Sequence, residues 1–281
     1  MSSSKKIISF QGIYGAYSDL VCRKFFGDFK TLPCKSFEET LSSVQENQSQ
    51  LALIPVENSI GGRVSDMHIM LKDIKLKIIY EFYHKVEHNL LAKKETKLVE
   101  IQEAFSHEQA LAQCKGKLRS LKIKGTKYID TAGAAQYVSK SKRKNIGAIA
   151  STLASEIYDL KILKKNVEDS DFNITRFLVF AKKSIEISKK KNVRTTIVFD
   201  TKNAPASLYN ALGGFAKRKI NLSRLESFVV NSEFKKSSFL ADIESHPQKN
   251  EFIDSLNELK KFSNSVRIIG YYEAKNPKSN K

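Results

Sequence analysis

The sequence predicts an α/β protein with two domains, and three features of its patterning indicate this fold. Over the first two thirds of the chain, short apolar runs alternate with segments whose apolar residues recur at helical spacing, which favours mostly parallel sheets covered by helices. A polar stretch at 184–192 then interrupts the pattern. After it, the predicted order is strand, helix, strand, strand, helix, strand, which is typical of a ferredoxin-like domain.

Strands and helices alternate from the start of the first domain. Strands are expected at 7–10, 51–56, 77–83, 90–92, 103–105, 126–129, 146–150 and 177–180. Helices are expected at 18–26, 36–47 and 61–72, and after Ser106, Asp130 and Ser151. The pair Ser36 and Glu39 forms a capping-box pattern at the start of the second helix.

The second domain has its own predicted elements. Strands are expected at 195–200, 220–230, 238–243 and 266–272, and helices at 206–218 and 251–262. These assignments divide the chain into a first domain at 5–183, a linker at 184–193, a second domain at 194–273 and a disordered polar tail at 274–281.

Composition excludes several classes of protein. No run of eighteen apolar residues is present, and the first apolar run is too short for a secretory signal, so we expect a soluble cytoplasmic protein without a membrane partner. Three scattered cysteines form neither a disulfide framework nor a zinc motif. The formal net charge of +18 comes mostly from dispersed lysines without a nucleic-acid-binding motif. We therefore expect a small anionic partner rather than a nucleic acid.

Four segments of the first domain place small and polar residues just beyond strand ends, where α/β proteins bind ligands, and a fifth polar segment lies at the beginning of a strand. They read G-x-x-G-x-x-S at 12–18, P-V-E-N-S at 55–59, S-H-x-Q-A-L-A-Q-C at 106–114, D-T-A-G-A-A at 130–135 and N-x-T-R-F at 173–177. Glycines at the first segment let a ligand approach the backbone. Ser106 is expected at a helix N-cap, with Gln109 and Gln113 on one helix face.

Together and in this order, the five segments resemble the prephenate dehydratase family over about residues 7–182, and the second domain resembles the ACT domain that follows it. The resemblance implies a two-lobed catalytic domain of the periplasmic-binding-protein type, with the active site between the lobes. It implies a carbon–oxygen lyase that converts the dianion prephenate to phenylpyruvate in phenylalanine biosynthesis. Aromatisation drives this reaction, so no cofactor and no metal are expected. Arogenate, with an amino group in place of the keto group, remains an alternative substrate.

The resemblance also implies roles for individual residues. Thr175 is the catalytic residue, and hydrogen-bond donation to the leaving hydroxyl suits it because threonine is too weak an acid to release its proton. Arg176 would bind a carboxylate or brace the site, although a structural ion pair with Asp169 or Asp171 is an alternative. The residues expected to bind substrate are Asn58, Ser59, Ser106, Gln113, Thr131, Ala132, Gly133, Arg176 and Phe177.

The second domain is expected to mediate assembly into homodimers or homotetramers and to bind phenylalanine between two copies. The residues expected at the effector site are Asn203, Ala206, Ser207, Leu208, Asn221, Leu222, Glu226 and Ser227. Ala206 stands where the family usually has glycine, and Phe228 and Val229 replace a usual Arg-Pro pair. We therefore expect phenylalanine to inhibit weakly.

Three further departures occur in the first domain: Ala16 replaces a common threonine, Glu108 replaces a usual proline, and Gly61-Gly62-Arg63 replaces a frequent Glu-Gly pair. None of them removes Thr175. A protein of a different class, a two-lobed binding protein with an ACT sensor and no catalysis, is the alternative. It would not need the hydroxyl donor that the T-R-F segment retains.

Overall fold

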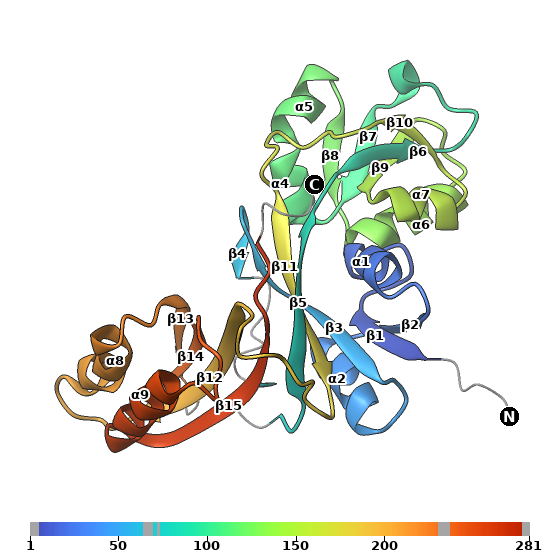
Figure 1. Cartoon of the computed structure of the whole chain (residues 1–281). Coiled ribbons are helices and arrows are strands. Elements are labelled where there is room, and N and C mark those ends of the chain that lie inside the picture. Colours follow the sequence, from blue (N-terminus) through green and yellow to red (C-terminus); the bar gives the residue numbers. More distant parts are fainter. Residues whose placement is uncertain (1–5, 64–69, 72–73, 230–236, 277–281) are drawn as a thin grey trace, which may run out of the picture.

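The computed structural model describes residues 6–63, 70–71, 74–229 and 237–276. In this part of the chain, two lobes form the first domain, and four further strands with two helices form the second (Figure 1). Two long strands run from one lobe of the first domain to the other (Figure 1).

The first lobe is built on a parallel core of three strands. Strand β1 (Ile7–Gln11) pairs with both β2 (Lys30–Cys34) and β3 (Leu51–Asn58) in parallel. Helices α1 (Tyr17–Phe25) and α2 (Phe37–Gln45) connect these strands. The predicted N-cap of α2 is confirmed, since the Ser36 hydroxyl accepts a hydrogen bond from the Glu39 amide at 3.1 Å. The carboxyl ends of β1 and β3 therefore point to one edge of the lobe.

The second lobe has a mixed sheet of five strands in the order β10-β6-β9-β7-β8. Its strands are β6 (Asn89–Ala92), β7 (Glu103–Ser106), β8 (Lys124–Lys127), β9 (Ile146–Ala150) and β10 (Lys161–Lys164). Its helices are α4 (Glu108–Gln113), α5 (Lys115–Ser120), α6 (Thr131–Lys140) and α7 (Thr152–Ile157), with a 3₁₀ turn at Leu98–Glu100. Helices α6 and α7 begin after Asp130 and Ser151, as predicted.

Strands β5 (Lys77–Lys85) and β11 (Ile174–Ala181) join the two lobes. Strand β11 lies between β3 and β5 in the first-lobe sheet and is antiparallel to both. In the second lobe, β6 is antiparallel to β9 and β10. The prediction of mostly parallel sheets is therefore wrong for these strands, because the chain enters the second lobe through β5 and returns through β11.

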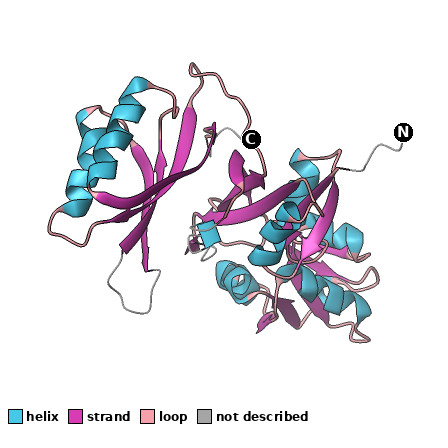
Figure 2. Cartoon of the chain, turned by 90° about the horizontal axis from the view of Figure 1, so that it is seen from below, coloured by secondary structure: helices cyan, strands magenta, loops and turns pink. Residues whose placement is uncertain are grey.

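The second domain confirms the predicted ferredoxin-like order. Its elements are β12 (Val193–Thr201), α8 (Ser207–Lys217), β13 (Leu222–Val229), β14 (Ser237–Ile243), α9 (Asn250–Lys261) and β15 (Ser263–Glu273). The strands are antiparallel in the order β13-β14-β12-β15. Both helices cover the same face of this sheet (Figure 2), so its other face is left to pack against the first domain.

The two domains share one sheet and one core. Gly270 of β15 pairs with Ile78 of β5, which joins the sheets of both domains. A Cβ atom at Gly270 would lie 2.2 Å from the Ile78 carbonyl oxygen, so only glycine allows the two backbones to approach this closely. Side chains from both sides, such as Ile54 and Leu240, belong to one buried cluster. The second domain is thus packed against the first and not merely tethered to it.

Some predicted elements differ from the structure. Strands β2 and β10 were not predicted, and β8 begins two residues earlier than expected. The helix predicted from 61–62 to 72 is wrong at its start, where Gly62–Arg63 forms the short strand β4 paired with β3. Met70 and Leu71 are helical, and the rest of that segment lies outside the described residues.

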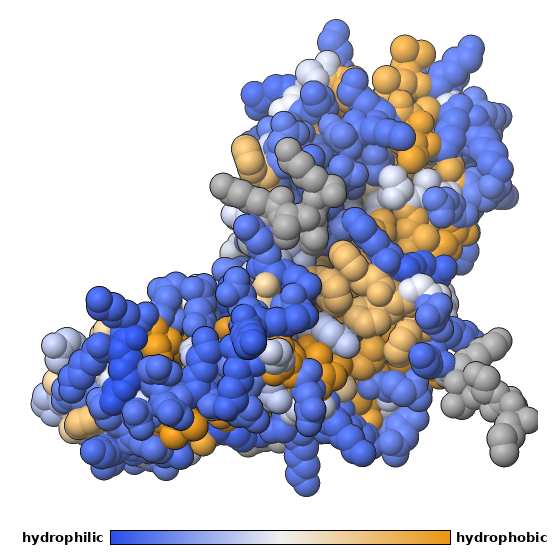
Figure 3. Space-filling model, in the orientation of Figure 1, coloured by the Kyte–Doolittle hydropathy of each residue, from blue (hydrophilic) through white to orange (hydrophobic). Residues whose placement is uncertain are grey.

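The surface reflects the composition. The face drawn in Figure 3 is largely hydrophilic over the second domain, as expected for a chain of net charge +18. Among the described residues, no helix has both the length and the hydrophobicity needed to span a bilayer.

The close contact at Gly270 predicts a large effect of a small substitution. Gly270→Ala should lower the free energy of unfolding by about 2 kcal/mol, because the new methyl group must push β15 away from β5. Gly213→Ala is the matched control. No atom lies within 4 Å of a Cβ built at this position in α8, so this change should raise stability by about 0.5–1 kcal/mol. Urea denaturation measures both, and equal effects of the two variants would contradict the proposed contact.

Candidate active site

A cleft of about 340 Å³ lies between the two lobes. Residues from all five predicted segments line it. The residues that line it are Gln11, Gly12, Ala16, Tyr17, Ser18, Pro55, Asn58, Val86, His88, His107, Gln109, Ala110, Gln113, Ile129, Asp130, Thr131, Asn173, Thr175 and Phe177. The volume is within the usual range for small-molecule sites.

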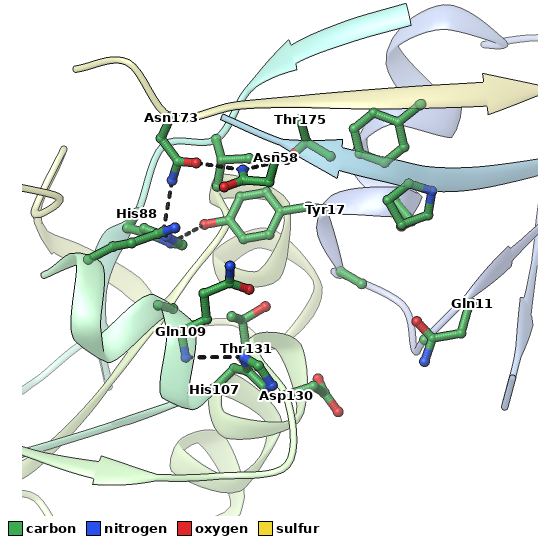
Figure 4. A pocket seen from close by; sticks show the side chains of 18 of the residues that line it. Gln11, Tyr17, Asn58, His88, His107, Gln109, Asp130, Thr131, Asn173 and Thr175 are labelled. Carbon is green, nitrogen blue, oxygen red and sulfur yellow. Dashed lines mark hydrogen bonds between the residues drawn. The ribbon is translucent and has the colours of Figure 1, made fainter. Parts of the chain in front are cut away.

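Thr175 reaches the cleft from the start of β11. It pairs with Asn58 of β3 in the ladder, and the Asn58 side-chain amide donates a hydrogen bond to the Thr175 hydroxyl at 3.0 Å. Because the hydroxyl oxygen accepts from Asn58, its own proton is directed elsewhere. Figure 4 shows both side chains at the same wall of the cleft. The arrangement leaves the Thr175 hydroxyl proton available for donation to another group.

The Asn58 amide is fixed in orientation by its other contacts. Its carbonyl oxygen accepts from the backbone amides of Ile60 and Gly61 at 3.0 and 2.7 Å. Its nitrogen also donates to the Asn173 carbonyl oxygen at 2.8 Å. Asn173 in turn donates to the side-chain oxygen of Gln113 at 2.9 Å. A continuous chain of amides therefore connects α4 in the second lobe to Thr175.

His88 ends this chain on the side of the second lobe (Figure 4). Its Nε2 atom lies 2.8 Å from the Gln113 oxygen, which can only accept, so Nε2 carries the proton. Its Nδ1 atom then accepts from the Tyr17 hydroxyl at 2.7 Å. Burial lowers the pKa of His88 and raises that of Tyr17, which keeps the histidine neutral and the tyrosine protonated. His88 and Tyr17 thus fix the orientation of Gln113.

The opposite wall of the cleft comes from the second lobe. His107, Gln109, Asp130 and Thr131 lie there (Figure 4). Gln109 and Gln113 both face the cleft from α4, as predicted. Of the described residues that line the cleft, none is a lysine or an arginine. The positive ends of the helix dipoles of α1 and α6, near Ser18 and Thr131, are the groups suited to an anion.

Several residues predicted to bind substrate are engaged in structural hydrogen bonds and do not line the cleft. The Ser59 hydroxyl donates to the Phe172 carbonyl and accepts from the Ile174 amide. Ser106 is fully buried and donates to the Ile149 carbonyl at 2.6 Å. The predicted N-cap role of Ser106 is also wrong, because α4 begins one residue later and His107 caps it.

One of the free backbone amides at the start of α6 is paired with the side chain that caps the helix. The Asp130 carboxylate accepts from the Gly133 amide at 2.7 Å, so this amide is already paired. Ala132 is fully buried and does not line the cleft. Thr131 does line it, and so does Phe177, which also belongs to the first-lobe core.

Arg176 is the largest correction to the predicted site. Its guanidinium contacts Glu81 of β5 at 2.9 Å, Asp242 of β14 at 2.6 Å and the Tyr272 hydroxyl of β15 at 3.0 Å. These groups lie between the two domains, so Arg176 does not bind a ligand in the cleft. The alternative of a structural ion pair is correct, but the partners are not Asp169 or Asp171. Successive residues of a strand point to opposite faces, which turns Arg176 away from Thr175.

Sequence reasoning assigned no role to Tyr17, His88 and Asn173, although they complete the hydrogen-bonded chain. Tyr17 and Asn173 lie within two of the five segments, which was a usable signal. His88 lies outside all of them, and nothing in its local sequence identifies it. The described residues contain no group of three or more potential metal ligands, and all three cysteines are free and buried.

A second pocket of about 290 Å³ lies at the start of α8. Asn203, Ala206, Ser207 and Leu208 line it, as the predicted effector site requires. The other predicted effector residues do not: Asn221, Leu222, Glu226 and Ser227 lie on or beside β13. The structure of one chain therefore separates the predicted effector residues into two groups.

Comparisons with known proteins identify relatives that cover nearly the whole chain. The family model described as prephenate dehydratase matches residues 8–185. A bifunctional N-acyl-homoserine lactone acylase/prephenate dehydratase of Komagataeibacter europaeus is 38% identical over 273 residues, which is 97% of each chain. Arogenate dehydratase/prephenate dehydratase 1 of Arabidopsis thaliana is 37% identical over 96% of this chain and 72% of its own. A prephenate dehydratase structure from Arthrobacter aurescens matches with a TM-score of 0.87 at 24% identity, covering 95% of this chain and 90% of that chain, and supports the fold.

The environment of Thr175 predicts a pH-dependent stability. His84 of β5 pairs with Thr175 in the ladder, and burial followed by the nearby Lys24 lowers its pKa from 6.5 to about 4. Between these values the unfolded chain binds a proton that the folded chain does not. His84 therefore destabilises the fold progressively as the pH falls from 6.5 to about 4, and has no such effect above 6.5.

Urea denaturation of the wild type and of His84→Gln across this range isolates the contribution, because glutamine does not titrate. The difference between their free energies of unfolding should be constant above pH 7. On acidification, the free energy of unfolding of the wild type should fall by more than that of His84→Gln. A difference that is independent of pH would disprove the burial effect.

Proposed function

The chain belongs to the prephenate dehydratase family, and we propose that its cleft converts prephenate to phenylpyruvate by removing water and carbon dioxide together. The observation that carries this proposal is the hydroxyl of Thr175, which is held by Asn58 so that its proton is directed away from Asn58. The enzyme is a carbon–oxygen lyase. Electrons of the bond to the departing carboxylate move into the ring and expel the ring hydroxyl, so the chemistry needs no external oxidant or reductant.

Thr175 stabilises the hydroxyl as negative charge develops on it. A hydrogen bond from a fixed donor is worth more in a cleft of low dielectric than in water, and it strengthens as the carbon–oxygen bond breaks. Only 6% of the surface of Thr175 is exposed, so water competes little for this donor. Full proton transfer from threonine is not required, because the leaving hydroxide can take its proton from solvent.

Neutral donors hold the two carboxylates of the substrate. We place one at the start of α1, near Ser18, and the other at the start of α6, near Thr131, since both helix ends border the cleft. Gln113 supplies a further contact whose orientation is fixed by His88 and Asn173. Phe177 provides an apolar surface on the Thr175 side.

Arogenate is a second candidate substrate because a relative of 37% identity is named for both activities. Asp130, the one acidic side chain among the described residues of the cleft, could pair with the ammonium group that arogenate carries and prephenate lacks. Parallel assays with prephenate and arogenate distinguish the two, since the products are phenylpyruvate and phenylalanine. A kcat/KM at least tenfold higher for one compound would assign the substrate.

The role of Thr175 predicts distinct effects of two substitutions. Thr175→Ala should lower kcat by roughly 10²-fold or more, as expected for the loss of a hydrogen bond to developing charge. Thr175→Ser keeps the hydroxyl and should retain most of the activity. Phenylpyruvate absorbance in alkali measures both rates, and normal turnover by a folded Thr175→Ala variant would refute the assigned role.

We further propose that the second domain is an ACT domain that assembles homo-oligomers and binds phenylalanine between two copies. Two features support this. Strand β13 lies at the edge of the sheet and so presents backbone groups to a second copy. The expected effector residues divide between the pocket at α8 and the β13 region, as a site shared by two copies would require.

The conformation of Ala206 suggests a substitution that should increase both stability and phenylalanine binding. It caps α8 in the left-handed conformation, with φ at 59°, which costs a residue with a Cβ atom about 1 kcal/mol. Ala206→Gly should raise the free energy of unfolding by up to about 1 kcal/mol. It should also lower the phenylalanine concentration for half inhibition, because the pocket gains room.

Ala204→Gly is the matched control in the same loop. Ala204 has no positive φ, so glycine there should only destabilise, by about 0.4–1 kcal/mol. Equal changes in stability for the two variants would exclude strain at Ala206.

A further inference from the structure

Thr175 and Arg176 are consecutive residues with opposite surroundings. Thr175 faces the cleft, whereas the Arg176 guanidinium is buried between β5 and the second domain. Because the two residues occupy adjacent backbone units of one strand, a displacement of the Arg176 backbone moves Thr175 as well.

The ladder is least regular at this position. Arg176 pairs with Glu57 of β3, but Phe177 pairs with Pro55, so Val56 is an extra residue that forms a bulge. Bulges re-aim the side chains beside them. On the side of β3 the start of β11 is therefore held less regularly than on the side of β5, where the pairs from Ile174 to Val179 are in register, so further contacts can affect its position.

Asp242 supplies such a contact from the second domain. It is fully buried, and its two oxygens have separate donors, Arg176 Nη1 at 2.6 Å and the Thr196 hydroxyl at 2.6 Å. Tyr272 completes the set, since its hydroxyl contacts both Arg176 and Thr196. The second domain thus holds one side of the guanidinium.

The first domain holds the other side through Glu81, which is shared with Arg194. Arg176 and Arg194 both contact Glu81, and Asp242 lies against Arg176 with Arg224 nearby, so each buried carboxylate has cationic partners. Without the charge of Asp242, two cations would share Glu81. Arg176 Nη1 would then be drawn toward Glu57, which lies 3.9 Å away on the bulged strand.

We propose that Asp242 is a positioning residue for catalysis: held in the second domain, it fixes Arg176 and through it the Thr175 hydroxyl. This inference rests on the proposed role of Thr175. The second domain thereby completes the active site of its own chain, apart from any effect of phenylalanine. Asn58, Gln113 and the helix ends, which bind substrate, do not contact Asp242, so the effect falls on kcat and not on KM.

A double-mutant cycle tests this in the full-length protein with prephenate as substrate. Asp242→Asn should lower kcat about tenfold or more, as expected for misplacement of a catalytic group, and should change KM less than about threefold. In a Thr175→Ala background, the same substitution should have little further effect on kcat. Tyr272→Phe, which removes one hydroxyl, should produce a smaller fall in kcat with the same coupling.

Glu258→Gln is the matched control in the second domain. Glu258 forms an ion pair with Arg218 at 2.7 Å, away from β11, and its loss should leave kcat unchanged. Circular dichroism and thermal melts establish that each variant is folded at the assay temperature, and Tyr272→Phe carries the test if Asp242→Asn does not fold.

Two results would overturn the inference: a kcat of folded Asp242→Asn within twofold of the wild type, or an equal fall in kcat in both backgrounds. For Tyr272→Phe the same two results would be decisive. A wild-type protein without turnover of prephenate would instead refute the proposed function, so the two failures are distinguishable.

Discussion

The position of β11 between β3 and β5 is the constraint on which the rest of the structure depends. This one strand lies inside the sheet of the first lobe, returns the chain from the second lobe and presents consecutive residues to two different environments. The Thr175 side chain on one face of β11 lines the cleft, and the Arg176 side chain on the other face lies in the domain interface. Catalytic geometry and domain packing therefore share a single backbone segment.

The cleft is proposed to bind a dianion through neutral donors and not through basic side chains. Its described lining has no lysine or arginine, whereas the whole chain has a formal net charge of +18. Surface lysines can attract an anion over long distances, but they would be screened by salt. Helix ends and fixed amides then replace the water of the bound carboxylates. These neutral donors need no counter-charge and leave the site unchanged when the product departs.

Local patterns in the sequence predicted much of the fold, since short apolar runs bounded by polar residues, such as 51–56 and 146–150, favour buried strands and are strands here. They missed β2, which contains Pro33, and β10, in which Lys161 and Lys164 flank only two apolar residues. Strand direction was also missed, because the partners Thr175 and Asn58 are far apart in sequence and no local signal reports their pairing.

The residues of the candidate site were likewise predicted only in part. Motifs located Thr175, Asn58 and Gln113, whose side chains line the same cleft. They also included Ser106 and Arg176, which serve packing and the domain interface. For Arg176 the alternation of a β-strand already implied that it could not face the cleft together with Thr175. His88 could not be found from sequence because its role arises only when β5 brings it to α4 and α1.

The return of β11 also has a consequence for the order in which the molecule can be built. Every strand of the second-lobe sheet lies between residues 89 and 164, so that lobe is continuous in sequence. The first lobe is not, because its central strand is synthesised only after the second lobe is complete. During translation the second lobe can fold as a unit, while β3 keeps an unpaired edge until β11 emerges from the ribosome. The slow step of folding should therefore be the insertion of β11, a contact of long sequence separation, and the active site forms only at that step.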